Sequence, residues 1–146
     1  MTLSDPFCVD RFRDEFLDLM RSGTVDIVFA NEHEVKSLYQ TSSLDAALDA
    51  FRNDCKLGIV TRGGDGSVVV QSSATVDVEP ETVREVVDTT GAGDLYAAGF
   101  LYGYTRGLDL GHCGKLGSLA ASLVIQQIGP RLQVSLKEAA AEAGLI

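Results

Sequence analysis

The sequence contains no tryptophan, only three prolines and three cysteines, and far fewer basic than acidic residues. Cys8, Cys55 and Cys113 lie far apart, form no C-x-x-C pair and match no zinc-binding spacing, so we expect reduced, buried thiols. The net charge of -9 repels phosphate backbones, so no nucleic acid is expected as a partner. No apolar run reaches the roughly 18 to 20 residues that a membrane span requires, and no signal peptide is recognisable. We therefore expect no membrane partner and a cytoplasmic protein.

The composition is that of an ordinary globular protein, with 146 residues, 45% hydrophobic and 23% charged. This length predicts a single domain over residues 1–146 with a real core. Apolar runs at residues 25–30 and 57–61 are typical of buried strands, and residues 67–71 and 75–78 predict a returning hairpin strand and an edge strand. Helices are expected over residues 10–21, 94–106 and 110–127, and after Asn31, Ser43 and Ser135. The expected fold class is α/β, with a mostly parallel sheet flanked by helices.

The most distinctive segment is D-T-T-G-A-G-D at residues 88–94, between an extended stretch and a helix. Its glycines allow a tight turn, and the amides of Gly91, Ala92 and Gly93 would form an anion site at the helix N-terminus. Asp94 beside such a site makes chemical sense as a base that takes a proton from a hydroxyl attacking phosphorus. The segment lacks the lysine of a Walker A motif and the third glycine of a dinucleotide fingerprint. The plainer alternative is a tight turn with Asp94 at a helix start.

Three motifs in the same order resemble those of the ribokinase (PfkB) family of carbohydrate and nucleoside kinases. Residues 88–94, followed by Y-A-A-G-F at residues 96–100, are similar to its C-terminal signature. Asn31 and Glu34 match its N-x-x-E motif, and residues 61–66 match its T-x-G-x-x-G loop. The resemblance implies the C-terminal half of a ribokinase-like three-layer fold with a β-hairpin. It also implies ATP-dependent phosphorylation of an alcohol group on a nucleoside or sugar.

The resemblance assigns roles to individual residues. It makes Asp94 the catalytic base and the amides at residues 91–93 the γ-phosphate site, with Asn31 and Glu34 holding the water shell of Mg²⁺. The residues implied to line the nucleotide site are Asn31, Thr61, Gly63, Gly64, Gly66 and Gly93. Without the resemblance, Asn31 and Glu34 have the spacing of a helix capping box, and residues 61–66 are a simple hairpin turn.

A monovalent cation site, with K⁺ as the expected ion, is also implied by the resemblance. Asp88 and Thr90 match its first loop, and ungapped counting puts the second loop at Val124, Gln127, Gly129 and Gln133. Most of these would act through backbone carbonyl groups. The resemblance also implies that the adenine lies near Ser118 and Ala121, on a helix rich in small residues.

Residues 124–131, with Ser135 and Leu136, resemble the bacterial adenosine-kinase-like branch, which favours a nucleoside acceptor. The resemblance covers only the C-terminal half of family members, and no early Gly-Gly motif is found. The alternative hypothesis is therefore a truncated nucleotide-binding module without catalytic activity, and a purely structural domain is the third. A parallel sheet cut in half exposes an apolar edge, so we also expect a homo-oligomer.

Overall fold

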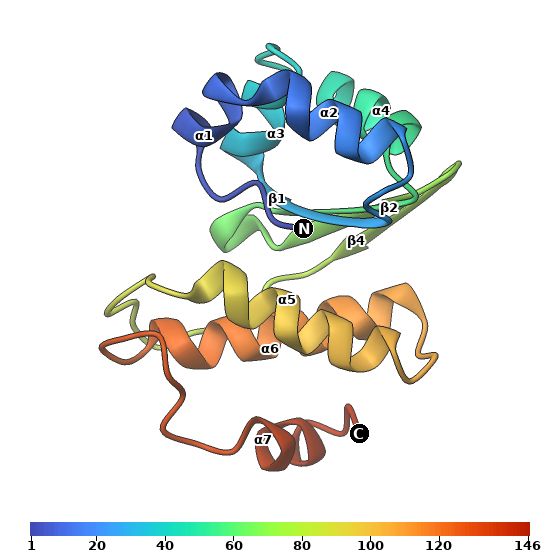
Figure 1. Cartoon of the computed structure of the whole chain (residues 1–146). Helices are drawn as coiled ribbons and strands as arrows, with labels where there is room; N and C mark the ends of the chain where they lie inside the picture. Colours follow the sequence, from blue (N-terminus) through green and yellow to red (C-terminus); the bar gives the residue numbers. More distant parts are fainter. The chain divides into compact units, whose positions relative to one another are not determined.

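The computed structural model describes all 146 residues, which form two compact units (Figure 1). The first unit comprises Met1–Gly63 and Ser67–Asp77, and the second comprises Gly64–Gly66 and Val78–Ile146. Each unit is considered by itself below, and the single domain expected over residues 1–146 stays a prediction. No helix is both long enough and apolar enough to cross a membrane.

The first unit is built on a four-stranded sheet. Its strands lie in the order β1 (Ile27–Asn31), β2 (Leu57–Thr61), β3 (Ser67–Gln71) and β4 (Ala74–Val78). β1 and β2 are parallel, whereas β3 returns antiparallel to β2 after the short turn between them. Thr2 adds an isolated parallel bridge to Phe29 of β1. The sheet is thus mixed, and within this chain the parallel part is confined to β1, β2 and that bridge.

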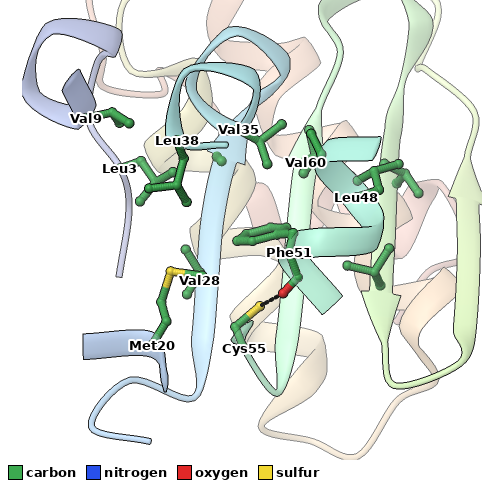
Figure 2. Close-up of a cluster of buried hydrophobic side chains, with 14 residues drawn as sticks. Leu3, Val9, Met20, Val28, Val35, Leu38, Leu48, Phe51, Cys55 and Val60 are labelled. Atoms are coloured by element: carbon green, nitrogen blue, oxygen red, sulfur yellow. Dashed lines mark hydrogen bonds between the residues drawn. The ribbon is translucent and has the colours of Figure 1, made fainter. Parts of the chain in front are cut away.

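Four helices cover one face of this sheet (Figure 1). They are α1 (Pro6–Arg11), α2 (Arg13–Arg21), α3 (Glu32–Leu38) and α4 (Leu44–Asp54). Phe51 of α4 is fully buried in the hydrophobic cluster beneath them, together with Val28 and Val60 of the strands (Figure 2). Cys55 donates its thiol hydrogen to the Phe51 carbonyl at 3.2 Å. A Cβ atom at Gly58 would lie 2.6 Å from the Phe51 ring, which explains a glycine in mid-strand.

The start of the chain differs from expectation. The helix predicted over residues 10–21 is wrong in its bounds, because α1 ends at Arg11 and α2 begins at Arg13. The Arg13 guanidinium donates to the Leu38 carbonyl at 3.1 Å and to the Ser37 carbonyl at 3.2 Å. These carbonyl groups lie in the last turn of α3, and the Ser37 oxygen also accepts from the Gln40 amide at 3.1 Å. Phe12, which lies between the two helices, is 43% exposed.

The second unit is helical, with α5 (Ala92–Tyr104), α6 (Leu110–Ile125) and α7 (Leu136–Glu142). α5 and α6 run side by side along their lengths (Figure 1). Glycines allow this close approach: a Cβ atom at Gly99 would lie 2.4 Å from the Leu116 carbonyl oxygen. At Gly117 it would lie 2.9 Å from the Tyr96 carbonyl oxygen. The close packing expected of the small-residue helix is confirmed, although that helix ends at Ile125 rather than at residue 127.

Candidate functional site

The N-terminus of α5 carries the glycine-rich segment. Gly91 occupies the N-cap position with a φ of 80°, and no side chain caps this helix end. The Ala92 amide donates to the Thr89 carbonyl oxygen at 3.2 Å, so it is engaged within the loop. The amides of Gly93 and Asp94 follow in the first turn, where helix geometry provides no intrahelical acceptor, and both residues are exposed. An anion can therefore reach this helix end beside the Asp94 carboxylate.

Asp88 connects this segment to a second loop. Its Oδ1 accepts a hydrogen bond from the Thr90 amide, and its Oδ2 accepts one from the Gly129 amide, both at 2.9 Å. Hydrogen bonds from the Thr90 side chain and from the Thr90 and Gly129 amides lower the pKa of Asp88. The Val87 amide also donates to the Ile125 carbonyl oxygen at 2.7 Å. The carboxylate therefore joins two loops that are 41 positions apart in the sequence.

Gly91 is held against the second loop. A Cβ atom on Gly91 would lie 2.7 Å from Cβ of Pro130 and 3.1 Å from its Cα. Only glycine combines this close approach with a positive φ at low cost. The position of the α5 N-terminus is therefore set by Gly91, Asp88 and the loop that begins after α6.

The residues predicted to bind a monovalent cation fall in these two loops. Asp88, Thr90 and Gly129 come together, and the Asp88 carboxylate, which accepts three hydrogen bonds in all, retains a lone pair for a cation. The Val124 carbonyl oxygen already accepts from the amides of Gln126 and Gln127, so it has no free lone pair. K⁺ therefore fits the Asp88 side of the predicted site better than its Val124 side.

Two more residues of the second loop bond to each other. The Gln127 side chain donates to the Arg131 carbonyl oxygen and accepts from the Gln133 amide, the latter at 3.2 Å. These bonds close the loop on itself. The predicted roles of Gln127 and Gln133 in cation binding stay predictions.

In the first unit, Asn31 and Glu34 form a complete capping box at the start of α3. The Asn31 side chain accepts from the Glu34 amide at 2.8 Å, and Glu34 accepts from the Asn31 amide at 2.8 Å and from Asn31 Nδ2 at 2.9 Å. Glu34 is only 5% exposed, and this burial raises its pKa, opposed by the bond from the Asn31 backbone. Each Glu34 oxygen keeps a lone pair for a water molecule, so a hydrated Mg²⁺ fits this pair. The capping box is confirmed, and the metal role stays a prediction.

The T-x-G-x-x-G loop starts beside this capping box. Thr61 ends β2 directly opposite Asn31, which ends the parallel strand β1. Two of the three predicted motifs thus meet at the carboxyl ends of two parallel strands, where ligands commonly bind in α/β proteins. Beyond Thr61 the chain makes a short 3₁₀ turn over Gly63–Asp65.

Gly66 ends this loop in the second unit. It has a φ of 82°, and a Cβ there would lie 2.1 Å from the Val78 carbonyl oxygen. Gly64 is different, since a Cβ there would meet nothing within 4 Å. Glycine is therefore structurally required at position 66 but not at position 64.

Ser118 and Ala121, predicted to lie near the adenine, are three positions apart on α6 and so share a helix face. Ser118 is 7% exposed and Ala121 is half-buried. Their role stays a prediction, as do the other site assignments.

The sequence motifs assigned no role to one basic residue in the T-x-G-x-x-G loop. Arg62 follows Thr61 and is the only basic residue between Thr61 and Gly66. Its position inside this loop was the sequence signal that could have pointed to a role in the site.

Comparison with known proteins identifies clear relatives. A family profile described as pfkB family carbohydrate kinase matches residues 1–137. A nucleoside kinase from Methanothermobacter thermautotrophicus is 36% identical over 115 residues, which cover 77% of this chain and 35% of that protein. Adenosine kinase from Saccharomyces cerevisiae is 34% identical over 142 residues, covering 89% of this chain and 41% of that protein.

The solved structures that resemble this chain are also named as kinases. A probable sugar kinase from Rhizobium etli CFN 42 superposes with a TM-score of 0.99 at 62% identity, covering 100% of this chain and 44% of that one. Adenosine kinase from Sinorhizobium meliloti gives a TM-score of 0.97 at 61% identity, covering 98% of this chain and 44% of that one. The chain spans less than half the length of the relatives it matches. The expected α/β fold class is confirmed, and the helix-flanked sheet, expected to be mostly parallel, is mixed in this chain.

Proposed function

Because the chain belongs to the pfkB family of carbohydrate kinases, we propose that it carries the nucleotide-binding and catalytic part of an ATP-dependent phosphotransferase. The acceptor is an alcohol group of a nucleoside or sugar. The observation that carries this proposal is the N-terminus of α5, which is uncapped by any side chain and has Asp94 exposed in its first turn. Such a helix end attracts an anion, and a carboxylate there serves as a base for an incoming hydroxyl.

In the proposed reaction, Asp94 accepts the proton of the acceptor hydroxyl as its oxygen attacks the terminal phosphorus of ATP. The amides at the start of α5 hold the phosphoryl oxygens, where negative charge develops. Asp88 and Gly91 keep these amides in place through the second loop. Mg²⁺, when bound near Asn31 and Glu34, would neutralise charge on the phosphate chain, and K⁺ would do so near Asp88 and Thr90.

A nucleoside is the favoured acceptor. Relatives named nucleoside kinase, adenosine kinase and cytidine kinase share 34 to 36% identity with this chain. A ribokinase from Lactococcus lactis shares 36% as well, so a sugar is the second candidate.

The share of its relatives' length that this chain spans supports one alternative function for the chain by itself. It spans 42% of one sugar kinase relative and 44% of one solved sugar kinase. A nucleotide-binding module without turnover would retain all the motifs above and lack most of an acceptor site.

A paired assay separates these functions. Thermal shift with Mg-ATP tests binding, and ATP consumption with a panel of nucleosides and sugars tests turnover. Stabilisation with turnover on a nucleoside supports the kinase, and stabilisation without turnover on any acceptor supports the binding module. If Mg-ATP neither stabilises the protein nor is consumed, both functions are wrong.

We also propose that the protein acts in the cytoplasm, where its ATP is supplied, and that it forms a homo-oligomer. The support for self-association is that β1 is an edge strand of the sheet, with only residues 1–3 beyond it, where Met1 and Leu3 bond to Ile27 and Phe29. Sedimentation at micromolar concentration is expected to show a dimer or larger species, and a monomer would contradict this expectation.

A further inference from the structure

Arg62 lies in the first unit at the carboxyl end of the parallel strands. It directly follows Thr61, whose partner across the sheet is Asn31. Its guanidinium is close enough to Glu32 to help lower the pKa of that carboxyl, after the larger effect of the Lys36 hydrogen bond. Arg62 therefore brings positive charge to the edge of the sheet where two of the motifs meet.

The hydrogen-bonding capacity of Arg62 is mostly unused. Its Nη2 lies 3.4 Å from Asp77 Oδ1, a long contact to a carboxylate that is 72% exposed. Its Nε is buried and has no hydrogen-bond partner. A guanidinium has five N–H donors, and a buried donor without an acceptor destabilises the folded state. No protein acceptor satisfies this donor, and the Arg62 side chain is 24% exposed, so an acceptor from outside the chain can reach the guanidinium and stabilise it.

Arg52 provides an internal comparison. Its Nη1 donates to the Ser72 carbonyl oxygen at 3.1 Å, and its Nη2 donates to Thr75 Oγ1 at 2.9 Å. Its Nε also lacks a hydrogen bond, although Asp49 lies 3.4 Å away. Arg52 thus clamps the turn between β3 and β4 with protein acceptors, whereas Arg62 has a single weak one.

We propose that Arg62 binds the phosphate chain of the nucleotide, donating hydrogen bonds from its guanidinium to phosphate oxygens. The planar fork of arginine matches phosphate geometry, and its bonds to phosphate are charge-assisted. In a chain with a net charge of -9, this side chain also offsets the repulsion that an entering polyphosphate meets from Glu32 and Asp77. The inference rests on the proposed function, because it assumes that the loop beginning at Thr61 faces the nucleotide.

The test compares Arg62→Gln with the unchanged protein by isothermal titration calorimetry. The probes are Mg-ATP, inorganic triphosphate and adenosine, which has no phosphate. Losing a charge-assisted bond should raise the Kd for Mg-ATP and for triphosphate about tenfold or more. The Kd for adenosine should not change. The Kd of Arg62→Lys for Mg-ATP should lie between those of the unchanged protein and Arg62→Gln, since lysine retains the charge without the planar fork of arginine.

Two controls separate binding from structure. Arg52→Gln is expected to lower Tm without changing the Kd for Mg-ATP. Asp77→Asn is expected to leave that Kd unchanged or lower it, since it frees the guanidinium. An equal loss of affinity in Asp77→Asn and Arg62→Gln would mean that the ion pair alone explains Arg62, and would overturn the inference.

The other possible outcomes of these titrations distinguish failure of the inference from failure of the proposed function. If the unchanged protein binds Mg-ATP and Arg62→Gln binds it equally well, the inference is wrong while the proposed function stands. If the unchanged protein binds neither Mg-ATP nor triphosphate, the proposed function fails as well. If Arg62→Gln does not fold, Arg62→Lys decides: weaker binding at an unchanged Tm supports the inference, and unchanged binding overturns it.

Discussion

The starts of α3 and α5 both carry predicted site residues, yet they are built in opposite ways. At α3, the side chains of Asn31 and Glu34 satisfy each other's backbone amides, and Glu34 is buried. At α5, Gly91 replaces a capping side chain, and Gly93 and Asp94 of the first turn are exposed. A helix start leaves several amides without intrahelical acceptors, so the protein must satisfy them or leave them for a ligand.

This difference separates a positioning role from a chemical one. The α3 end is complete without a ligand, which suits it to holding one carboxylate beside the water shell of a metal ion. The α5 end is incomplete by itself and depends on Asp88, 41 positions from its partner Gly129, to stay in place. Variants at the two helix starts test this contrast.

Asp94→Asn, made in a protein that turns over, should show the largest effect. If Asp94 is the base, turnover should fall about 100-fold or more, because the amide cannot accept the hydroxyl proton. The Kd for Mg-ATP and the Tm should change little, since the side chain is exposed. Steady-state kinetics measure this, and a fall in turnover of less than tenfold would remove Asp94 from the role of base.

Gly91→Ala should destabilise the second unit. The new Cβ would meet Pro130 at 2.7 Å in a residue with a φ of 80°, which costs about 1–3 kcal/mol. Gly93→Ala is the matched control, because a Cβ there meets nothing within 4 Å. Its stability should stay level or rise by up to about 1 kcal/mol. Urea unfolding of both variants gives the comparison, and equal stabilities would contradict the packing of Gly91 against the second loop.

The pH dependence should be the smallest effect, with opposite signs at the two helix starts. Burial raises the pKa of Glu34 in the folded state, so its contribution to stability is largest below the unfolded value of about 4.3 and falls as pH rises above it. Hydrogen bonds lower the pKa of Asp88, so its contribution is present above about 3.9 and is lost as pH falls below that value.

Tm measured between pH 3 and 7 in metal-free buffer tests this for Glu34→Gln and Asp88→Asn. The difference between the unchanged protein and Glu34→Gln should shrink as pH rises. The difference between the unchanged protein and Asp88→Asn should grow. Parallel curves for the two variants would show that the carboxyl groups do not titrate as described.

Local signals in the sequence predicted much of this structure. The bounds of β2 and β3 agree with the predicted strands, because apolar runs between turn residues leave little choice. Ser43 caps α4 as expected, accepting from the Ala46 amide at 3.2 Å. The cap of α1 was missed although its signal was present, since Asp5 precedes Pro6 and accepts from the Cys8 amide.

The features that the sequence did not predict depend on contacts between residues that are distant in the sequence. Directly after the break at Phe12, Arg13 donates to the Leu38 carbonyl oxygen, 25 positions away, a contact that the spacing of apolar residues does not predict. The motif match named Asp88 and Gly129 as cation ligands, but their direct hydrogen bond was not foreseen. Arg62 was overlooked because its unused donors are visible only once its neighbours are placed.

Local sequence patterns were enough for the α/β class, the three motifs and the caps at Asn31, Ser43 and Ser135, because each depends on residues within a few positions of one another. Only the tertiary structure decided that the carboxylate of Asp88 joins two loops and that Gly91 must be glycine against Pro130. It also decided that Thr61 ends its strand opposite Asn31. The physical reason is that hydrogen bonds and close contacts between remote segments depend on how the chain packs, which no local pattern of residues encodes.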